Sequence, residues 1–300
     1  MDKELHEYTP SELKGMQKKA LEMAGVFWGF CKEHGLTAYM CGGGLIGMLR
    51  SGGFIPWDDD IDFFMPRDDY ERFTKLWGSY ENGRDYALCV QSKDYVDHNI
   101  FATLRDRRTT YIKPYQKELD IVHGVQMDIL PLDGYPDKDH QRICQVLWAM
   151  IYSLFCAGTP PVKHGKLLET GGKILLNFFK GKNVRYLIWQ TAKKHMTKYR
   201  IDDCDALTEL CSGPHYMKNR YDKRWFSGYV EVDFEGVMLP IPIGADRYLR
   251  RAFGNYMELP PVEKRVANHS CVFIDLNRPY TRYKGIYYLK EKNKRKAATG

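Results

Sequence analysis

Carboxylates are concentrated in one short stretch of this chain, directly after Trp57. Four of the five residues from Asp58 to Asp62 are acidic. Their negative charges repel one another unless a cation or strong hydrogen-bond donors offset them. Asp60 and Asp62 are separated by one apolar residue, so in a strand both would point to the same face. We therefore predict a half-site for a hard divalent cation such as Mg²⁺, which binds one or two carboxylates together with substrate phosphate oxygens.

A glycine turn and a third carboxylate extend this arrangement. Three successive glycines precede the acidic run, and Gly43 and Gly44 would let backbone amides approach a phosphate closely. Asp128 alternates with Met127 and Ile129, so its side chain should project from the opposite face of a strand. A third carboxylate can complete a metal site or accept a proton from an attacking hydroxyl. Each feature alone is common in loops, but their joint occurrence in this order favours phosphate chemistry.

These residues need strands and helices to hold them. Apolar residues at helical spacing predict helices over residues 11–31, 68–77, 141–156, 166–180, 184–199 and 246–253, with a helical turn over 44–50. Alternating or short apolar runs predict strands over residues 37–41, 60–65, 86–91, 98–105 and 125–129, and short strands between 225 and 242. The sequence thus predicts an α/β (α+β) protein in which a mixed α/β unit precedes a mainly helical segment.

Composition narrows the class of protein. The chain has 300 residues with 44% apolar and 28% charged side chains, as in ordinary globular proteins. Residues 1–12 contain no signal-peptide core, and the longest apolar run, Ile143 to Gly158, is shorter than the roughly 20 residues that span a bilayer. The eight cysteines form no C-x-x-C pair. These features predict a reducing, cytoplasmic location, and no nucleic-acid-binding motif is present.

Longer strings around the carboxylates carry a family resemblance. The matching stretches are residues 42–47 with Arg50, 53–62, 69–73, 127–133, 234–236, 239–242, 248–249 and 253–257. The chain resembles the LicD family, phosphocholine transferases of the nucleotidyltransferase superfamily. The string Pro-Trp-Asp-Asp-Asp-Ile-Asp at residues 56–62 is highly specific, whereas Phe253 and Asn255 depart from the usual family residues. Residues 137–220 carry no motif of the family.

The resemblance implies a nucleotidyltransferase-like mixed sheet that transfers phosphocholine from CDP-choline to a hydroxyl. The acceptor would be a cell-surface glycan or its lipid-linked precursor, of the teichoic acid or lipopolysaccharide type. On this hypothesis Asp60 and Asp62 bind Mg²⁺, or Mn²⁺ in its place. Asp128 completes the metal site or takes the acceptor proton, and Asp58 binds a second ion or only holds the turn.

The same hypothesis gives roles to five further residues. Trp57 is a candidate wall for choline, because a quaternary ammonium is recognised by aromatic faces, although it can equally be a packing anchor. Arg50 and Arg105 are candidates for screening the pyrophosphate, and a salt bridge is the alternative for each. His98 and His269 are candidates for acid–base or substrate contacts near neutral pH.

Three competing interpretations and a domain division complete the expectations. A nucleotide-sugar glycosyltransferase also uses a D-x-D pair, a non-catalytic glycan-binding relative could retain the fold, and another CDP-alcohol could replace CDP-choline. We expect a catalytic core over residues 1–135, a mainly helical insertion over 136–222 and a C-terminal α/β segment over 223–300 that closes the site. The basic tail, Lys284 to Lys296, and the helix within 143–158 are candidates for peripheral contact with the inner face of the membrane.

Overall fold

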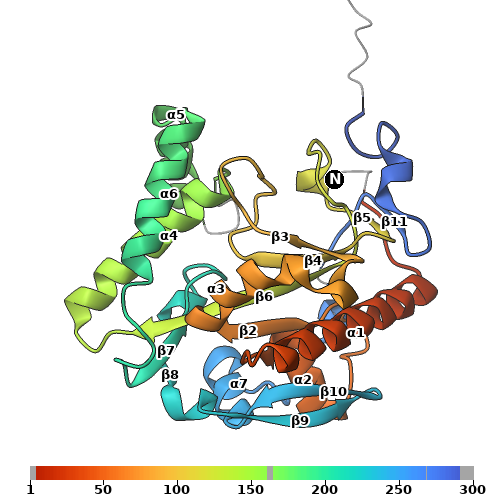
Figure 1. The fold of residues 1–300 in the computed structure, drawn as a ribbon, viewed down its shortest axis with the longest axis horizontal. Helices are drawn as coiled ribbons and strands as arrows, with labels where there is room; N and C mark the ends of the chain where they lie inside the picture. The colour runs from red at the N-terminus through yellow and green to blue at the C-terminus, as the bar shows by residue number, and fades with distance from the viewer. Residues whose placement is uncertain (1–4, 161–164, 268, 291–300) are drawn as a thin grey trace, which may run out of the picture.

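A mixed sheet forms the centre of the protein. The computed structural model describes residues 5–160, 165–267 and 269–290. Five strands lie side by side in the order β1 (Tyr39–Cys41), β2 (Asp62–Pro66), β6 (Gln126–Tyr135), β4 (Ala102–Asp106) and β3 (Tyr86–Cys89). The β2–β6 pair is parallel and the other neighbouring pairs are antiparallel. Two further strands, β7 (Ala206–Glu209) and β8 (Tyr221–Asp222), continue the sheet beside the second half of β6 (Figure 1).

Helices α1 (Pro10–Glu33) and α3 (Arg67–Leu76) pack on one face of this sheet. Helix α1 begins with a capping box in which the Thr9 side chain accepts from the Glu12 backbone and the Glu12 side chain accepts from Thr9. The ring of Phe27 lies 5.0 Å from Phe63 of β2 and 5.4 Å from Phe73 of α3, measured between centroids. The apolar residues of β2 and β6 that alternate with the carboxylates therefore form the core on this face.

The opposite face carries the polar residues and is covered differently. Helix α2 (Gly42–Ser51) follows β1 directly, and α7 (Ala245–Phe253) contacts it. The Tyr248 ring of α7 packs against Phe64 of β2 at 5.5 Å. A two-stranded ribbon, β9 (Tyr229–Phe234) with β10 (Val237–Pro242), lies beside β1 and α1.

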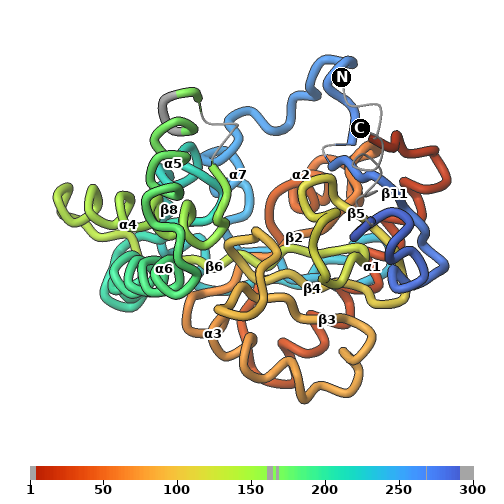
Figure 2. Tube along the Cα trace, turned by 90° about the horizontal axis from the view of Figure 1, so that it is seen from above, coloured from red at the N-terminus to blue at the C-terminus, as the bar shows by residue number. Residues whose placement is uncertain are grey.

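Two structures flank the sheet at opposite ends (Figures 1 and 2). At one end, α4 (Asp139–Ala157), α5 (Lys166–Phe178) and α6 (Lys182–Met196) form a three-helix unit with its own apolar cluster, in which Trp148 stacks on His195 at 4.6 Å. At the other end, β5 (Thr110–Ile112) pairs with β11 (Phe273–Asp275), which attaches the C-terminal segment to the strand region.

The predicted α/β class with a mixed sheet is confirmed, and the main helices form where helical spacing indicated. Several strand boundaries were wrong: β2 begins at Asp62 rather than Asp60, β4 begins at Ala102 rather than His98, and β6 ends at Tyr135 rather than Ile129. Among the helices that the structure describes, none has both the length and the apolar character needed to cross a bilayer. The division into units at 135/136 and 222/223 stays a prediction.

Candidate active site

The acidic run lies where strand pairing stops. Strand β1 ends at Cys41, whose partner on β2 is Asp62, so no neighbouring strand pairs with residues 58–61. These residues instead form an irregular segment that begins with a turn in which Asp58 N donates to Ile55 O at 2.9 Å. The prediction that Asp60 and Asp62 share one strand face is therefore wrong in its geometry. The loop nevertheless keeps Asp60 close to the strand carboxylates.

Asp62 and Asp128 meet across the parallel β2–β6 pair. The backbone N–H of Asp128 donates to Oδ1 of Asp62 at 3.1 Å. Burial raises the pKa of Asp62 well above its ordinary value, and the charges of Asp60 and Asp128 raise it further. The three predicted carboxylates are thus neighbours that repel one another, as expected for groups that share a cation.

The pKa values of Asp58 and Asp60 in the loop are also raised. Burial raises the pKa of Asp58 to about 7, with added repulsion from Asp60 and Asp59. Burial likewise raises the pKa of Asp60 to about 6, because the opposing charge of His269 only partly offsets it. Perturbed carboxylates that are packed together are typical of functional sites.

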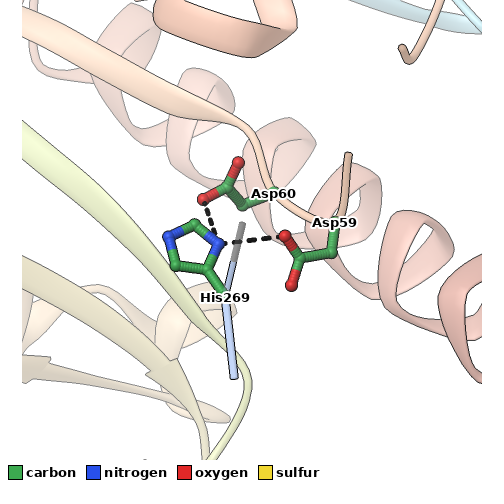
Figure 3. A group of neighbouring side chains, drawn as sticks. All are labelled: Asp59, Asp60 and His269. Atoms are coloured by element: carbon green, nitrogen blue, oxygen red, sulfur yellow. Dashed lines mark hydrogen bonds and ion pairs between the residues drawn. The ribbon is translucent and has the colours of Figure 1, made fainter. Parts of the chain in front are cut away.

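His269, from the C-terminal segment, provides the nearest positive charge. Its Nδ1 lies 2.9 Å from Oδ1 of Asp59 and 3.3 Å from Oδ2 of Asp60, so the ring contacts both carboxylates (Figure 3). Burial alone would lower the pKa of His269, but the hydrogen bond to Asp59 and the two negative charges raise it to about 9. The Tyr8 hydroxyl donates to the second oxygen of Asp59 at 2.9 Å, which holds that carboxylate in place.

Two overlapping sets of residues have the chemistry to hold a metal. The ligand atoms of Asp59, Asp60 and His269 lie within 4.8 Å of one another. The carboxylates of Asp60, Asp62 and Asp128 offer oxygen donors alone, which suit Mg²⁺ and Mn²⁺. His269 must lose its proton before it can bind a cation, and its raised pKa opposes that loss. The carboxylate set therefore fits a hard cation better, with His269 as a balancing charge.

One basic residue at this site carried no signal in the sequence. Lys113 is 8% exposed and lines the same small cleft as Asp60, Asp128 and His269. Its charge helps to lower the pKa of Asp60. Lys113 directly follows β5, and only the pairing of β5 with β11 brings it here together with the C-terminal segment. Lys113 and His269 thus supply the positive charge beside the carboxylates.

The glycine turn lies next to the acidic loop. Helix α2 begins at Gly42, two residues earlier than expected. A Cβ on Gly43 would lie only 1.9 Å from Oδ2 of Asp58, whereas one on Gly44 would contact Met40 and Ile61. Gly43 is therefore required for the close approach of the Asp58 carboxylate. The predicted contact of Gly43 and Gly44 with a phosphate stays a prediction.

Arg50 and Trp57 lie beside this region with contacts of their own. Arg50, in the last turn of α2, donates to the backbone oxygen of Tyr256. It is thus separated from the glycines by most of a ten-residue helix, about 12 Å along the axis. Trp57 is half-buried, and the guanidinium of Arg265 lies 5.7 Å from its ring centre. The Arg265 guanidinium thus lies over the ring face proposed for choline, and the predicted contact of Trp57 with choline stays a prediction.

Arg105 and His98 make their hydrogen bonds to groups other than the carboxylates of the predicted metal site. Arg105 forms a 2.9 Å ion pair with Asp97, and both side chains are only 1% exposed. This buried pair corresponds to the structural alternative for Arg105. His98 has a positive φ of 68° and its Nδ1 lies 2.6 Å from the Ala157 backbone oxygen, at the wall of a separate cavity. The substrate-binding roles of both residues stay predictions.

Comparison with known proteins identifies the class of this site. Residues 35–143 match the family model described as LicD/FKTN/FKRP, nucleotidyltransferase domain. This match spans the glycines, the acidic run and Asp128, so these residues lie in a LicD-family nucleotidyltransferase domain, and the predicted resemblance is confirmed. A relative from Haemophilus influenzae, the lipopolysaccharide cholinephosphotransferase LicD, is 26% identical over 279 residues. The alignment covers 86% of this chain and 96% of the relative.

Proposed function

We propose that this protein transfers phosphocholine from CDP-choline to a hydroxyl of a cell-surface glycan or of its lipid-linked precursor, with Mg²⁺ or Mn²⁺ as cofactor. The observation that carries this proposal is the meeting of Asp60, Asp62 and Asp128 beside Lys113 and His269. The named activity of the Haemophilus relative supports the choice of phosphocholine as the transferred group.

On this proposal the residues around the cleft have separate roles. Asp60 and Asp62 would hold the cation, Asp128 would either complete the metal site or take the acceptor proton, and Asp58 would bind a second ion or hold the turn. When bound, the cation supplies positive charge against the pyrophosphate of the donor. Lys113 and His269 add positive charge beside these carboxylates, which would offset the charge that develops on the departing CMP.

The proposed transfer is direct and forms no covalent enzyme intermediate. The acceptor oxygen forms a bond to the phosphorus that bears choline, and the bond from that phosphorus to the CMP oxygen breaks. The hydroxyl proton passes to a carboxylate, for which Asp128 is the candidate, and CMP leaves as the anion. Choline contacts the face of Trp57, where Arg265 lies in the absence of substrate.

A lipid-linked acceptor lies in a membrane, and CDP-choline reaches it from the cytoplasm. On this proposal the enzyme acts at the cytoplasmic surface of that membrane. Helix α4 packs against α6 through Tyr152 and Trp189, so most of its apolar residues face protein. The three-helix unit still exposes apolar side chains on α5 and α6: Ile174, Leu175, Phe178, Val184 and Leu187. We therefore favour α5 and α6 over α4 for peripheral membrane contact. The end of the basic tail, residues 291–296, lies outside the described residues.

Calorimetric titration tests the donor and the carboxylate site together. We expect CDP-choline to bind to the wild type in the presence of Mg²⁺, and binding to be lost with EDTA or in Asp62→Asn. A UDP-sugar that binds in place of CDP-choline would instead favour the glycosyltransferase interpretation. Metal-dependent turnover of a different CDP-alcohol would preserve the chemistry and change the donor. No turnover of any CDP-alcohol, with glycan binding retained, would indicate a non-catalytic relative.

A further inference from the structure

A large cavity lies next to the carboxylate cleft. Its volume is about 540 Å³, within the range typical of small-molecule sites. It lies between the residues that precede β4, the loop after β7 and helix α4, and its walls include Phe101, Tyr115, Met150 and Ser212. None of these residues belongs to the sequence motifs around the carboxylates.

Two chain segments connect the cavity with the cleft. Phe101 lines the cavity, and two residues later Thr103 is the strand partner of Asp128. Tyr115 lines the cavity, and two residues earlier Lys113 lines the cleft. Between Phe101 and Thr103 the chain passes through the first residue of β4, where two residues of extended chain span about 7 Å. A ligand with phosphates at the carboxylates can therefore reach the cavity through a linker as short as a ribose.

The cavity has no charge to match a charged ligand group. Within the described part of the chain, no Asp, Glu, Lys or Arg side chain lines it. Of the three parts of a CDP-alcohol, the pyrophosphate is anionic and choline is cationic, whereas the nucleoside is neutral. Aromatic walls from Phe101 and Tyr115 suit a planar base, and the polar groups of Asn99 and Ser212 suit its edges.

Two local features indicate that the cavity receives a ligand. The hydroxyl oxygen of Ser153 is buried in the wall and has no hydrogen-bond partner among the described residues. Buried polar atoms are nearly always paired, so this one suits a ligand group. His98, also in the wall, has a φ of 68°, a strained conformation that a non-glycine residue adopts rarely and that is concentrated at ligand sites.

We propose that this cavity binds the nucleoside of a nucleoside diphosphate donor whose phosphates lie at the carboxylate cleft. This assignment rests on the proposed function for the identity of the donor. It gives His98, Tyr115 and Ser153 a role in nucleotide recognition, apart from the residues that act on phosphorus. It also explains how residues without a family motif contribute to the site.

Binding of CMP, measured by calorimetry, tests the assignment. Ser153→Phe fills the cavity, and Tyr115→Ala removes an aromatic wall that is 54% exposed and carries little of the fold. We expect each change to weaken CMP binding about tenfold or more, with the melting temperature retained for Tyr115→Ala. The control, Leu147→Phe, alters an exposed position of the same helix α4 and should leave the affinity unchanged.

The outcomes separate this assignment from the proposed function. Unchanged CMP affinity in both variants would overturn the assignment, and a raised KM for the acceptor alone would show that the cavity receives the acceptor instead. Cavity-dependent CMP binding in a protein that turns over no CDP-alcohol would preserve the assignment and refute the proposed function.

Discussion

The carboxylate end of the sheet and the three-helix unit differ in almost every physical property. The first packs Asp59, Asp60, Asp128 and His269 around a cleft of about 10 Å³, with Asp58 and Asp62 as charged neighbours. The second borders a cavity of about 540 Å³ whose described walls include no Asp, Glu, Lys or Arg side chain, and it exposes apolar side chains to solvent. One region concentrates charge and leaves little space, whereas the other offers space without charge.

If the proposed function holds, this difference separates the region of the chemistry from the region of substrate recognition. Charge stabilisation requires fixed, closely packed groups, whereas a donor and a lipid-linked acceptor require room and apolar surface. Strand β6 joins the two regions, since its first half carries Asp128 and its second half pairs with β7. Changes at the first region should therefore affect turnover, and changes at the second should affect binding.

The largest expected effect comes from removing one charge at the carboxylate end. Asp62→Asn should lower turnover about 1,000-fold or more, because a cation site loses a ligand charge. Its melting temperature should stay equal or rise, because the change relieves the repulsion that raises the pKa of Asp62. Steady-state kinetics and thermal unfolding measure the two quantities.

Asp202→Asn is the matched control, since this side chain is 79% exposed and lies outside the cleft. Near-normal turnover in Asp62→Asn would contradict the assignment of the carboxylates. An unfolded Asp62→Asn protein would show that the residue serves the fold rather than the reaction.

The second effect concerns how stability depends on pH at the same end of the molecule, where the C-terminal segment attaches to the strand region. Burial lowers the pKa of His123 from 6.5 to about 4, and its ring lies 4.3 Å from Tyr288 of the C-terminal segment. Below pH 6.5 His123 binds a proton in the unfolded chain but stays neutral in the folded protein. The free energy of unfolding therefore falls as the pH drops towards 4. The loss should reach up to about 3 kcal/mol. Urea unfolding at pH 7 and pH 5 measures it.

His123→Gln should flatten this dependence, and His140→Gln, at an exposed position of α4, should not. Hydrogen exchange adds a regional readout, because the loss of protection at pH 5 should appear around β5 and β11 before it appears in α4 and α6. Equal loss in both regions would contradict the proposed local cause.

The sequence predicted the elements of the site better than its assembly. Local spacing predicted α1, α3 and the first half of β6. It also grouped Asp60, Asp62 and Asp128, because the glycines, the D-x-D pair and the third carboxylate follow one another in order. The start of β2 at Asp62 was not predicted, because it depends on where the partner strand β1 ends.

The remaining parts of the site depend on contacts between distant segments. Strands β5 and β11 have three residues each and lie far apart in the chain, so neither has a usable pattern alone. Their pairing brings Lys113 and His269 into the cleft, whereas in the sequence His269 is a single histidine far from the acidic run. The cavity has no motif for the same reason, because its walls come from four separate segments.

A smaller effect tests whether Trp57 belongs with the chemistry or with recognition. Trp57→Ala should raise the KM for CDP-choline about tenfold while kcat changes less, because cation–π contacts contribute about 1–2 kcal/mol. The effect should shrink for a CDP-alcohol without a positive charge. An unchanged KM would leave Trp57 as a packing anchor for the acidic loop, in which case melting temperature alone should fall.

The smallest effect concerns the exposed surface of the three-helix unit. Phe178 is 80% exposed at the end of α5, near Lys173, Lys180 and Lys182 in the sequence. Apolar side chains flanked by lysines are typical of helices that lie at an anionic membrane surface. Phe178→Glu should therefore weaken sedimentation with phosphatidylglycerol vesicles several-fold, since it removes apolar contact and adds repulsion, while turnover of a water-soluble acceptor stays unchanged.

Val262→Glu is the matched control, because Val262 is 72% exposed but lies outside the three-helix unit. Retention of both variants on vesicles at low salt would remove this surface from the membrane hypothesis. Loss of binding in Phe178→Glu alone would place recognition of the lipid-linked acceptor at the same end of the molecule as the cavity, and would separate it from the carboxylates that act on phosphorus.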